Sequence, residues 1–543
     1  MDDAFLPGAG ESKLLTLLPA EVLHHILQFL PPADLVLRVP YVCSALHAFI
    51  KGNRNLFRQV YLYVLDDPAD NTGLNWEQEV RDLVRLETIC NRQAAADKSH
   101  ELDFVHDIVT HLLKNASPSD ESINPSRTHA TSRNAALLRR IFHDGTTSEA
   151  FLQRSSLFER VRDHHHHSAS AAAPQSVNAD RRAIQQKSAH LHCLHGRPIL
   201  NAGRLRSHRT YPFACSKVYD MREYTMNSRW GPFLSDGSDG VDWEKVEAIL
   251  VVLSNNVGPR RKVPQIFGEI WDKPFSGSWS DSFKVPPPRD LTSLEARDPY
   301  GVTGTWYRIV CFLDYSDFFA FNFPDHDFVA PDAPRPALDV GEATRLIMLR
   351  LQVTSIENPG PDDGQDLPVV HFKGVSRSLD DSFDHNANSG IRGTVRLTRE
   401  GEVRWTTFSI FHGVERWRSE GVQIGGVRSA RGVVGNWFDR DYDGHGPAGP
   451  TAFWKVGTAD QVANMEDDLL PNALFLPYAA LIDMDAEIDL EADMSYNSDD
   501  DDEDDDDDDE MDGEELSELL HDAELPLTDV GVSDLIIVHH QQL

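Results

Sequence analysis

The most constraining feature of this 543-residue sequence is a change in hydrophobic pattern near Asp298. Before this residue, apolar side chains recur every three or four positions, which is the period of an amphipathic helix. After it, short apolar segments are divided by Gly, Pro and Asp, and many short segments of this kind indicate a sandwich or a barrel. We therefore predict an α+β multidomain protein, with helices first and an antiparallel, barrel-like β domain after them.

Changes in composition divide the chain further. The expected parts are a helical unit over residues 14–65, a helical region over 74–163, a low-complexity linker over 164–186, a mixed central region over 187–297, a β-rich domain over 298–458 and an acidic tail over 459–543. The linker is assigned from a His run followed by Ser and Ala. Helices are expected over Trp76–Ala96, Leu102–Leu113, Asn134–Phe142, Ser148–Arg162 and Val241–Leu253.

The β segments are short and closely spaced. The segment LTREGEVRWTTFSIF is typical of a hairpin, with Glu400 and Gly401 at its turn. Closing such strands into a barrel removes exposed strand edges. The expected strands are Gly304–Leu313, Phe318–Phe323, Ala343–Ile356, Val369–Ser376, Ile391–Arg399, Glu402–His412, Gly421–Gly425, Gly432–Phe438 and Thr451–Val456.

The net charge of −36 is strongly negative, and a large share of it lies between Asp499 and Glu515. Self-repulsion predicts that this tail is disordered. Strong acidity disfavours nucleic acid as a partner and leaves basic proteins as an alternative one. The five cysteines are scattered without a CxxC pair, which favours reduced thiols in the cytoplasm or nucleus. Neither a secretory signal nor an apolar run of about 20 residues is present, so no membrane partner is expected.

The segment LLPAEVLHHILQFLPPADLVLRVPYVCSALHAFI carries more apolar side chains than so small a unit can bury. It resembles an F-box, and Leu56, Phe57 and Arg58 resemble the usual ending. The resemblance implies binding to a Skp-type adaptor and, through it, to the cullin scaffold of a ubiquitin ligase. An ordinary helical cap on the next domain is the alternative. The residues that would bind the adaptor are Leu18, Pro19, Glu21, Val22, Leu23, Ile26, Leu27, Leu30, Pro31, Leu35, Val42 and Cys43.

The central segments SAHLHCLHG and VDWEKVEAILVVL are similar to the central region of a family of fungal F-box proteins, a resemblance that implies no chemistry. His190, His192, Cys193 and His195 were candidates for a metal site. Zinc needs about four ligands, and no second ligand pair stands at a familiar spacing. We therefore expect core or surface histidines, with no metal and no cofactor.

The β-rich domain begins with Gly304-Thr305-Trp306-Tyr307, which resembles the lipocalin and calycin signature. The resemblance implies that Trp306 closes one end of a barrel able to hold a small apolar ligand or a peptide end. Plain core packing is the alternative role for Trp306.

The loop DYDGHGP, with Tyr442 and His445, is similar to a Tyr-Gly-x-His-Gly loop in the barrel of some F-box-only proteins that bind substrate peptides. It lacks the Gly after the Tyr. Arg428, Arg431 and Arg440 are expected nearby to pair with acidic or carboxylate groups. A loop shaped by turn geometry alone is the alternative.

The sequence shows no phosphate loop, HExxH pair or GxSxG elbow, so no catalytic residue is assigned. We predict a non-catalytic substrate receptor of a cullin–RING ubiquitin ligase that holds an unknown protein substrate through its β domain. Two alternatives stay open. One is a calycin-like protein that binds a small ligand or peptide, and the other is a binder of basic proteins through the acidic tail.

Overall fold

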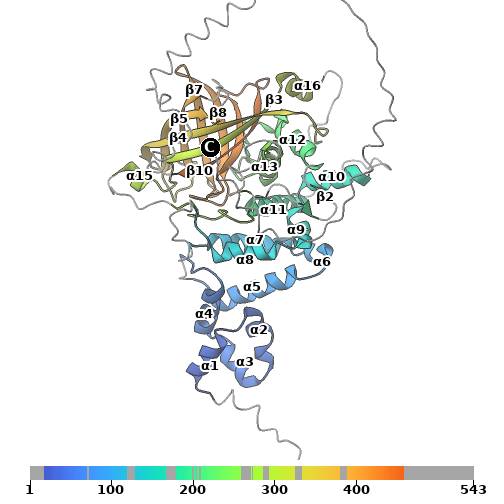
Figure 1. Ribbon diagram of the computed structural model, residues 1–543, viewed down its shortest axis with the longest axis vertical. Coiled ribbons are helices and arrows are strands. Elements are labelled where there is room, and N and C mark those ends of the chain that lie inside the picture. The colour runs from blue at the N-terminus through green and yellow to red at the C-terminus, as the bar shows by residue number, and fades with distance from the viewer. Residues whose placement is uncertain are drawn as a thin grey trace, which may run out of the picture. The chain divides into compact units, whose positions relative to one another are not determined.

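A computed structural model shows helices over the N-terminal half and a closed barrel after them (Figure 1). The acidic tail, including Asp499–Glu515, lies outside the described residues, and so do positions 167–178 of the expected linker. The structure describes residues 18–69, 73–118, 129–166, 179–197, 201–202, 205–206, 209–257, 271, 273–284, 293–324, 333–379 and 388–457.

The first helices are α1 (Ala20–Leu27), α2 (Pro32–Leu37), the 3₁₀ helix η3 (Val39–Tyr41), α3 (Ser44–Ile50) and α4 (Arg54–Val64). Pro32 occupies the first turn of α2, where a missing N–H costs no intrahelical bond. Asn53 caps α4 by accepting a hydrogen bond from the Leu56 N–H at 3.1 Å. Their shared core contains Leu23, Leu27, Leu35, Leu46, Ile50, Leu56, Phe57 and Val60.

The next helices are α5 (Trp76–Cys90), α6 (Ala95–Ser99), α7 (Leu102–Lys114), α8 (Arg133–Ile141) and α9 (Gly145–Leu152). Helix α5 packs against α2 and α4. Asp66 follows α4 and is buried, and it accepts hydrogen bonds from the Ser132 hydroxyl at 2.5 Å and from the Arg133 N–H at 2.9 Å. The start of α8 is therefore held to the end of the first helical unit.

The central region is mostly helical. It contains α10 (Ser156–His166), α11 (Ala179–His195), the short strands β1 (Asn201–Ala202) and β2 (Leu205–Arg206), α12 (Tyr211–Val218), η6 (Met221–Glu223), α13 (Trp243–Val257) and α15 (Leu294–Arg297). Helix α13 is buried along most of its length, because α11 and α12 pack on one side of it and strands of the barrel on another. A helix that is apolar on most faces is typical of such a central position.

Three predictions about these helices are wrong in part. The helix expected over Trp76–Ala96 ends at Cys90, because the chain leaves the helical conformation after Asn91, and Ala95 begins the separate helix α6. The helix expected over Ser148–Arg162 is two helices, α9 and α10, because Gln153 leaves the helical conformation between them. The expected linker extends too far, because residues 179–186 begin α11. Gln185 there is buried and donates a hydrogen bond to Glu159 at 2.5 Å, so tertiary contacts order this part of the low-complexity segment.

The β-rich domain is a closed antiparallel barrel in which neighbours in sequence are neighbours in space, and the last strand pairs with the first. In its register Trp306 faces Leu349 on one side and Lys455 on the other. The hairpin turn at Gly401 has a φ of 85°, a conformation that favours glycine. The strands are β3 (Gly304–Leu313), β4 (Glu342–Glu357), β5 (Val369–Ser378), β6 (Ser389–Leu397), β7 (Val403–Phe411), β8 (Val414–Gln423), β9 (Val433–Asp439) and β10 (Ala448–Gly457).

The strand expected over Phe318–Phe323 is wrong, because these residues belong to helix α16 (Tyr315–Asn322). Asp314 caps this helix by accepting a hydrogen bond from the Ser316 N–H at 2.8 Å. Phe318 is buried against Tyr219 of the central region, with ring centroids 6.4 Å apart. The cap and this contact override the β preference of a run of aromatic residues. The strand expected over Gly421–Gly425 begins earlier, at Val414.

The barrel buries side chains on both faces of β9, β10 and β3. On β10, Phe453 points into the barrel while Ala452 and Trp454 point outward, toward the helices around α13. Alternation along a strand sends neighbours to opposite faces, so these strands are buried at most positions. The helices therefore cover one wall of the barrel and leave its two ends to the connecting loops.

Candidate functional site

One end of the barrel is filled by aromatic side chains. Trp306 is 2% exposed, its indole N–H donates to the Val302 carbonyl at 2.9 Å, and its ring lies 5.1 Å from that of Trp405 and 5.8 Å from that of Phe453. Trp306 thus fills this end of the barrel, which we call the closed end. A side chain so enclosed has no surface for a protein substrate.

Arg431 lies behind the closed end and is 3% exposed. Its guanidinium donates to the carbonyls of His195 at 2.8 Å and Lys273 at 3.1 Å, and to the Ser278 hydroxyl at 2.9 Å. Burial lowers the pKa of Arg431 to about 9. Arg431 therefore joins the barrel to the central helices and faces no solvent.

Arg428 lies on the same β8–β9 connection and donates to the Asp298 carbonyl at 2.6 Å. Successive connections of an antiparallel meander alternate between the two ends of a barrel, so this connection lies opposite the β9–β10 loop. Contrary to the expected grouping, Arg428 and Arg431 are not near Tyr442 and His445. Sequence proximity misled here because strand β9 separates the two connections.

The other end, which we call the open end, carries the β9–β10 loop with Arg440, Tyr442 and His445. The Tyr442 ring packs 5.7 Å from Trp230 and 6.1 Å from Phe438, and its φ is 41°. The His445 ring stacks 4.7 Å from Phe323, and the Tyr315 hydroxyl donates to the His445 carbonyl at 3.1 Å. Helix α16 and the central region thus fix the shape of this loop.

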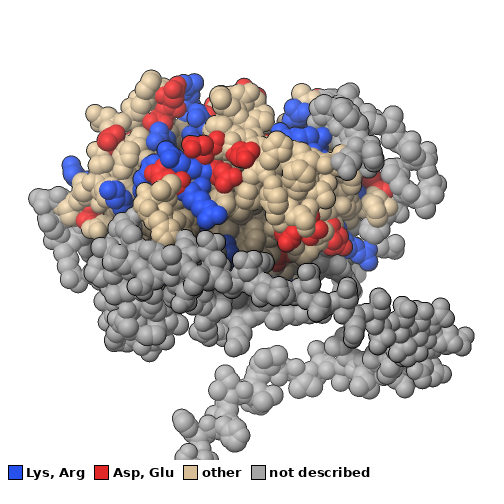
Figure 2. All heavy atoms as spheres, turned by 90° about the horizontal axis from the view of Figure 1, so that it is seen from above, with Lys and Arg blue, Asp and Glu red and all other residues tan. Residues whose placement is uncertain are grey.

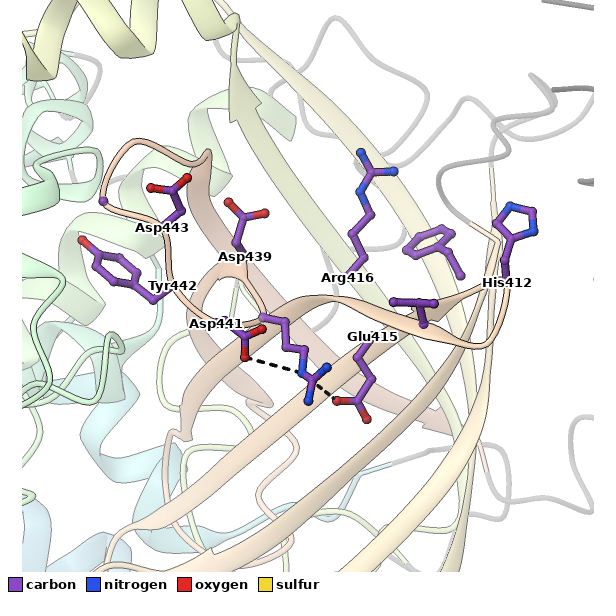
Figure 3. Close-up of a pocket in the computed structure, with 11 residues that line it drawn as sticks. His412, Glu415, Arg416, Asp439, Asp441, Tyr442 and Asp443 are labelled. Carbon is purple, nitrogen blue, oxygen red and sulfur yellow. Dashed lines mark ion pairs between the residues drawn. The ribbon is translucent and has the colours of Figure 1, made fainter.

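An open hollow of about 720 Å³ lies between this loop and the β7–β8 turn (Figure 3). Glu415 and Arg416 come from β8, and the acidic side chains of the β9–β10 loop face them across the hollow. The residues that line it are Phe411, His412, Val414, Glu415, Arg416, Asp439, Arg440, Asp441, Tyr442, Asp443 and Gly444. Four of these are carboxylates and two are arginines.

The charges of the hollow are only partly paired. Arg440 lies 3.2 Å from Glu415 and 3.6 Å from Asp441, and Arg392 also pairs with Glu415. The Arg392 contact lowers the pKa of Glu415. Burial and the nearby Asp443 raise the pKa of Asp439. Arg440 is thus already engaged by acids of this chain, and the hollow has a surplus of negative charge, which suits a positively charged group better than an acidic one.

Charges elsewhere on the described surface are mixed in sign. Seen from above, basic and acidic side chains lie side by side within a larger uncharged area (Figure 2). Several are ion pairs, such as Arg404 and Arg418 with the buried Glu420. Recognition by the barrel therefore depends on local features such as the hollow.

The first helical unit presents an apolar face to solvent. Leu18, Val22 and Ile26 are 36%, 43% and 42% exposed. The spacing of four residues places Val22 and Ile26 on one side of α1, and Leu18 lies two residues before the start of this helix. Leu23 and Leu27 lie about 100° farther around the helix axis, on the neighbouring face, and are buried. Helix α1 thus has two apolar stripes, although one is enough to attach it to its own core.

The outward stripe continues into neighbouring elements through Phe29, Leu37, Tyr41 and Val42, which are 54%, 51%, 82% and 70% exposed. Of the residues expected to bind the adaptor, Leu35 is also buried, Leu30 and Cys43 are intermediate, and Pro19, Glu21 and Pro31 are exposed. Exposed apolar residues gathered on so small a unit indicate a surface for another protein.

Residues 15–63 match the F-box-like family. This match supports, in general, an adaptor role in an SCF-type (Skp–cullin–F-box) ubiquitin ligase, because F-box domains bind Skp-type adaptors and are typically non-catalytic. Comparisons with curated proteins and with solved structures find no match. The F-box-like match covers less than a tenth of the chain and does not include the barrel.

Of the central histidines, His192 and His195 are buried in the core and His190 is partly buried. His192 is 2% exposed with its Nδ1 2.6 Å from a Glu247 carboxylate oxygen, and His190 stacks on Trp243 at 3.9 Å. Burial lowers the pKa of His190 and of His195. Among the residues that the structure describes, no group of three or more His, Cys, Asp and Glu side chains is placed to hold a metal ion. Nor is any helix there long and apolar enough to cross a membrane.

The sequence reasoning missed Phe29 and Tyr41 on the F-box-like domain, and Tyr315 and Phe319 at the open end. A signal existed for Phe29, because it continues the spacing of Val22 and Ile26. No comparable signal existed for Tyr315 and Phe319, because the run of aromatic residues in α16 favours a strand when only the sequence is considered.

Proposed function

We propose that this chain is the substrate-recognition subunit of an SCF-type ubiquitin ligase. In this proposal the F-box-like domain binds a Skp-type adaptor attached to a cullin scaffold, and the β-rich domain over 298–458 recruits a protein substrate. The observation that carries the proposal is the exposed stripe of Leu18, Val22 and Ile26 on a domain that matches the F-box-like family. A helical unit that served only as a cap on the next domain would bury those side chains against that domain.

The proposed contribution to ubiquitination is proximity. A receptor that holds its substrate beside the charged conjugating enzyme raises the effective concentration of the acceptor lysine, and it needs no catalytic group of its own. The chain therefore acts as a non-catalytic adaptor. Specificity then depends on the substrate surface, for which we propose the open end of the barrel.

The adaptor contact is tested with the double variant Val22→Asp/Ile26→Asp in the full-length chain. Both side chains are more than 40% exposed, so the variant should fold, whereas a change at the buried Leu23 would also damage the core. Charges at the centre of an apolar interface cost about 2 kcal/mol or more each, so affinity for the purified Skp-type adaptor should fall at least about 100-fold.

Met226→Asp is the matched control, because Met226 is 76% exposed and lies outside the F-box-like domain. It should bind the adaptor as the unchanged protein does. Calorimetry with purified adaptor measures both variants. Unchanged affinity of the double variant, with its circular dichroism intact, would contradict the proposal.

For the substrate we propose a segment that carries lysine or arginine. The acid-rich hollow supports this, and so do the half-exposed rings of Tyr315 and Phe319 beside the loop. The Val22→Asp/Ile26→Asp variant serves as a trap, since it should hold substrate without delivering it. Adding Asp441→Asn and Asp443→Asn to the trap should release the captured protein. Capture that persists at equal strength would place the substrate surface elsewhere.

A second candidate function is that of a small-ligand carrier, in line with the calycin resemblance. The observation that favours it is a cavity inside the barrel, which shares Phe411 with the lining of the hollow. Native mass spectrometry of the full-length protein tests it, because a stoichiometric small molecule would be retained. Binding of basic proteins by the acidic tail stays a prediction, since that tail lies outside the described residues.

A further inference from the structure

The barrel contains a buried arginine that has no counter-charge in the described part of the chain. Arg308 is 5% exposed, and it points into the barrel because it alternates with the outward-facing Ile309 and follows the inward-facing Trp306 by two positions. Its Nε donates to the Thr451 hydroxyl at 2.9 Å and one Nη to the Ser419 hydroxyl at 2.6 Å. Both partners are neutral, so neither compensates the charge.

The guanidinium has donors left over. It carries five N–H groups, and two of them make these hydrogen bonds, which leaves three without an acceptor among the described residues. Burial lowers the pKa of Arg308 only to about 10, so the group stays charged at neutral pH. A buried charge is costly unless it is paired, so this one is best stabilised when an anion occupies the remaining donors.

A cavity lies against this arginine on the side of the open end. Its volume is about 70 Å³, which corresponds to roughly five water-sized positions. Three serines line it, and of these Ser409 has a side-chain hydroxyl that makes no hydrogen bond to the described residues. Its lining comprises Arg308, Val310, Arg345, Ile347, Leu349, Ser376, Ser389, Ile391, Ser409, Phe411, Trp417 and Trp437.

A further polar group inside the barrel lacks a partner. Thr407 is 3% exposed, and its hydroxyl makes no hydrogen bond within the described chain. On β7 it lies between Trp405, which packs inside the closed end, and Ser409, which lines the cavity, so it faces the barrel interior beside Ser419. A buried hydroxyl without a partner costs about 1–3 kcal/mol and in this place indicates a missing polar ligand atom.

From this geometry we infer that the barrel interior binds a short-chain organic monocarboxylate, with its carboxylate on Arg308 and its hydrocarbon chain directed toward Trp417 and Trp437. A carboxylate matches the planar guanidinium and accepts two hydrogen bonds from it. The cavity admits about five to seven non-hydrogen atoms, the size of a four- to five-carbon acid. Phe411 lines both the cavity and the surface hollow, and it stands between the site and the open end.

The inference does not depend on the proposed receptor function, and it deepens the second candidate function by naming the ligand class of the same cavity. A chain that fails to bind the Skp-type adaptor would still bind the acid, because the F-box-like domain contributes nothing to the cavity. Conversely, a receptor without this site would still use the surface hollow. The two proposals are therefore tested by separate measurements.

The test is calorimetric titration of the full-length protein with butyrate at constant ionic strength, and with butyramide as the neutral probe of the same shape. We expect one equivalent of butyrate to bind, with affinity at least about tenfold above that of butyramide. Fluorescence reports the same event, because Trp417 and Trp437 line the site with ring centroids 5.2 Å apart.

Arg308→Met should lower butyrate affinity by about 10- to 100-fold. Arg399→Met is the matched control, because it also removes one positive charge but from the exposed β6–β7 turn at the closed end. If Arg308→Met does not fold, Ser409→Leu replaces it, since it fills the cavity and leaves the arginine in place. Three results would each overturn the inference. The unchanged protein could fail to bind butyrate, or could bind butyramide as tightly as butyrate. A folded Arg308→Met or Ser409→Leu variant could bind butyrate with undiminished affinity.

Discussion

The two ends of the barrel are formed by the same strands, yet they differ in almost every physical respect. At the closed end, Trp306, Trp405 and Phe453 pack edge to face and exclude solvent. Behind them the buried Arg431 donates hydrogen bonds to the backbone carbonyls of His195, in α11, and of Lys273. At the open end the connections leave a cavity inside the barrel and an acid-rich hollow on its surface.

The difference teaches that aromatic and charged residues have opposite roles at the two ends. An aromatic ring or an arginine at the closed end has exchanged water for protein partners, so its loss leaves a void or unpaired groups. Residues of the same types at the open end keep part of their contact with water. We therefore expect changes at the closed end to lower stability, and changes at the open end to alter binding.

The largest effect is expected for Trp306→Ala. Removing a fully enclosed indole leaves a cavity and an unpaired Val302 carbonyl, at a cost of about 3–5 kcal/mol in the free energy of unfolding. The control Tyr315→Ala removes a ring that is 52% exposed at the open end, and should cost less than about 1 kcal/mol. Urea unfolding of the two variants measures the contrast. Equal losses in the free energy of unfolding for the two variants would contradict the proposed difference between the two ends.

A smaller effect is expected for Arg431→Met, which preserves the length of the side chain and removes its donors. The carbonyls of His195 and Lys273 lose a partner in the interior, at a cost of about 2–4 kcal/mol. Arg440→Met at the open end removes a guanidinium that is 48% exposed, and should cost less than about 1 kcal/mol. If Arg431→Met lowers the free energy of unfolding only slightly, water must enter the closed end.

The smallest effect concerns pH. Burial raises the pKa of the partly buried Glu402, in the β6–β7 turn of the closed end, from its ordinary 4.5 to about 7. Because the folded pKa is the higher one, the stabilisation is complete below pH 4.5 and is lost as the pH rises through about 7. The loss is on the order of 1 kcal/mol after allowance for solvent screening.

The comparison for this prediction is Glu402→Gln, which keeps the size of the side chain and cannot ionise. Thermal unfolding between pH 5 and 8 should show the unchanged protein losing stability relative to the variant as the pH rises. Parallel curves for the two proteins would mean that Glu402 is solvated, and the closed end would then be more open than described.

Much of this architecture could be predicted from local sequence patterns. The change in hydrophobic period near Asp298, the many short β segments and the hairpin turn at Gly401 predicted a barrel-like domain, and the closed barrel is confirmed. The ordered F-box motifs were sufficient to predict an F-box domain, and the family match over residues 15–63 confirms an F-box-like domain there. These features are local, because helix period, strand alternation and turn chemistry each depend on residues close together in the chain.

What the sequence could not predict depends on partners far apart in the chain. The run around Phe319 was taken for a strand, and only contacts with the central region make α16 a helix. The arginines at 428, 431 and 440 were grouped by proximity, although strand β9 carries them to opposite ends. Arg308 was not predicted as a site residue, because a single arginine in an apolar strand forms no recognisable motif.

The sequence by itself determined that this chain has an adaptor-type helical domain and a β domain of many short strands, since each follows from residues spaced within a few turns or strands. The tertiary structure alone decided which end of the barrel is filled and which is open. It also decided that Arg308 is enclosed without a counter-charge. The physical reason is closure, because pairing β10 with β3 creates an interior whose contents depend on all the strands at once.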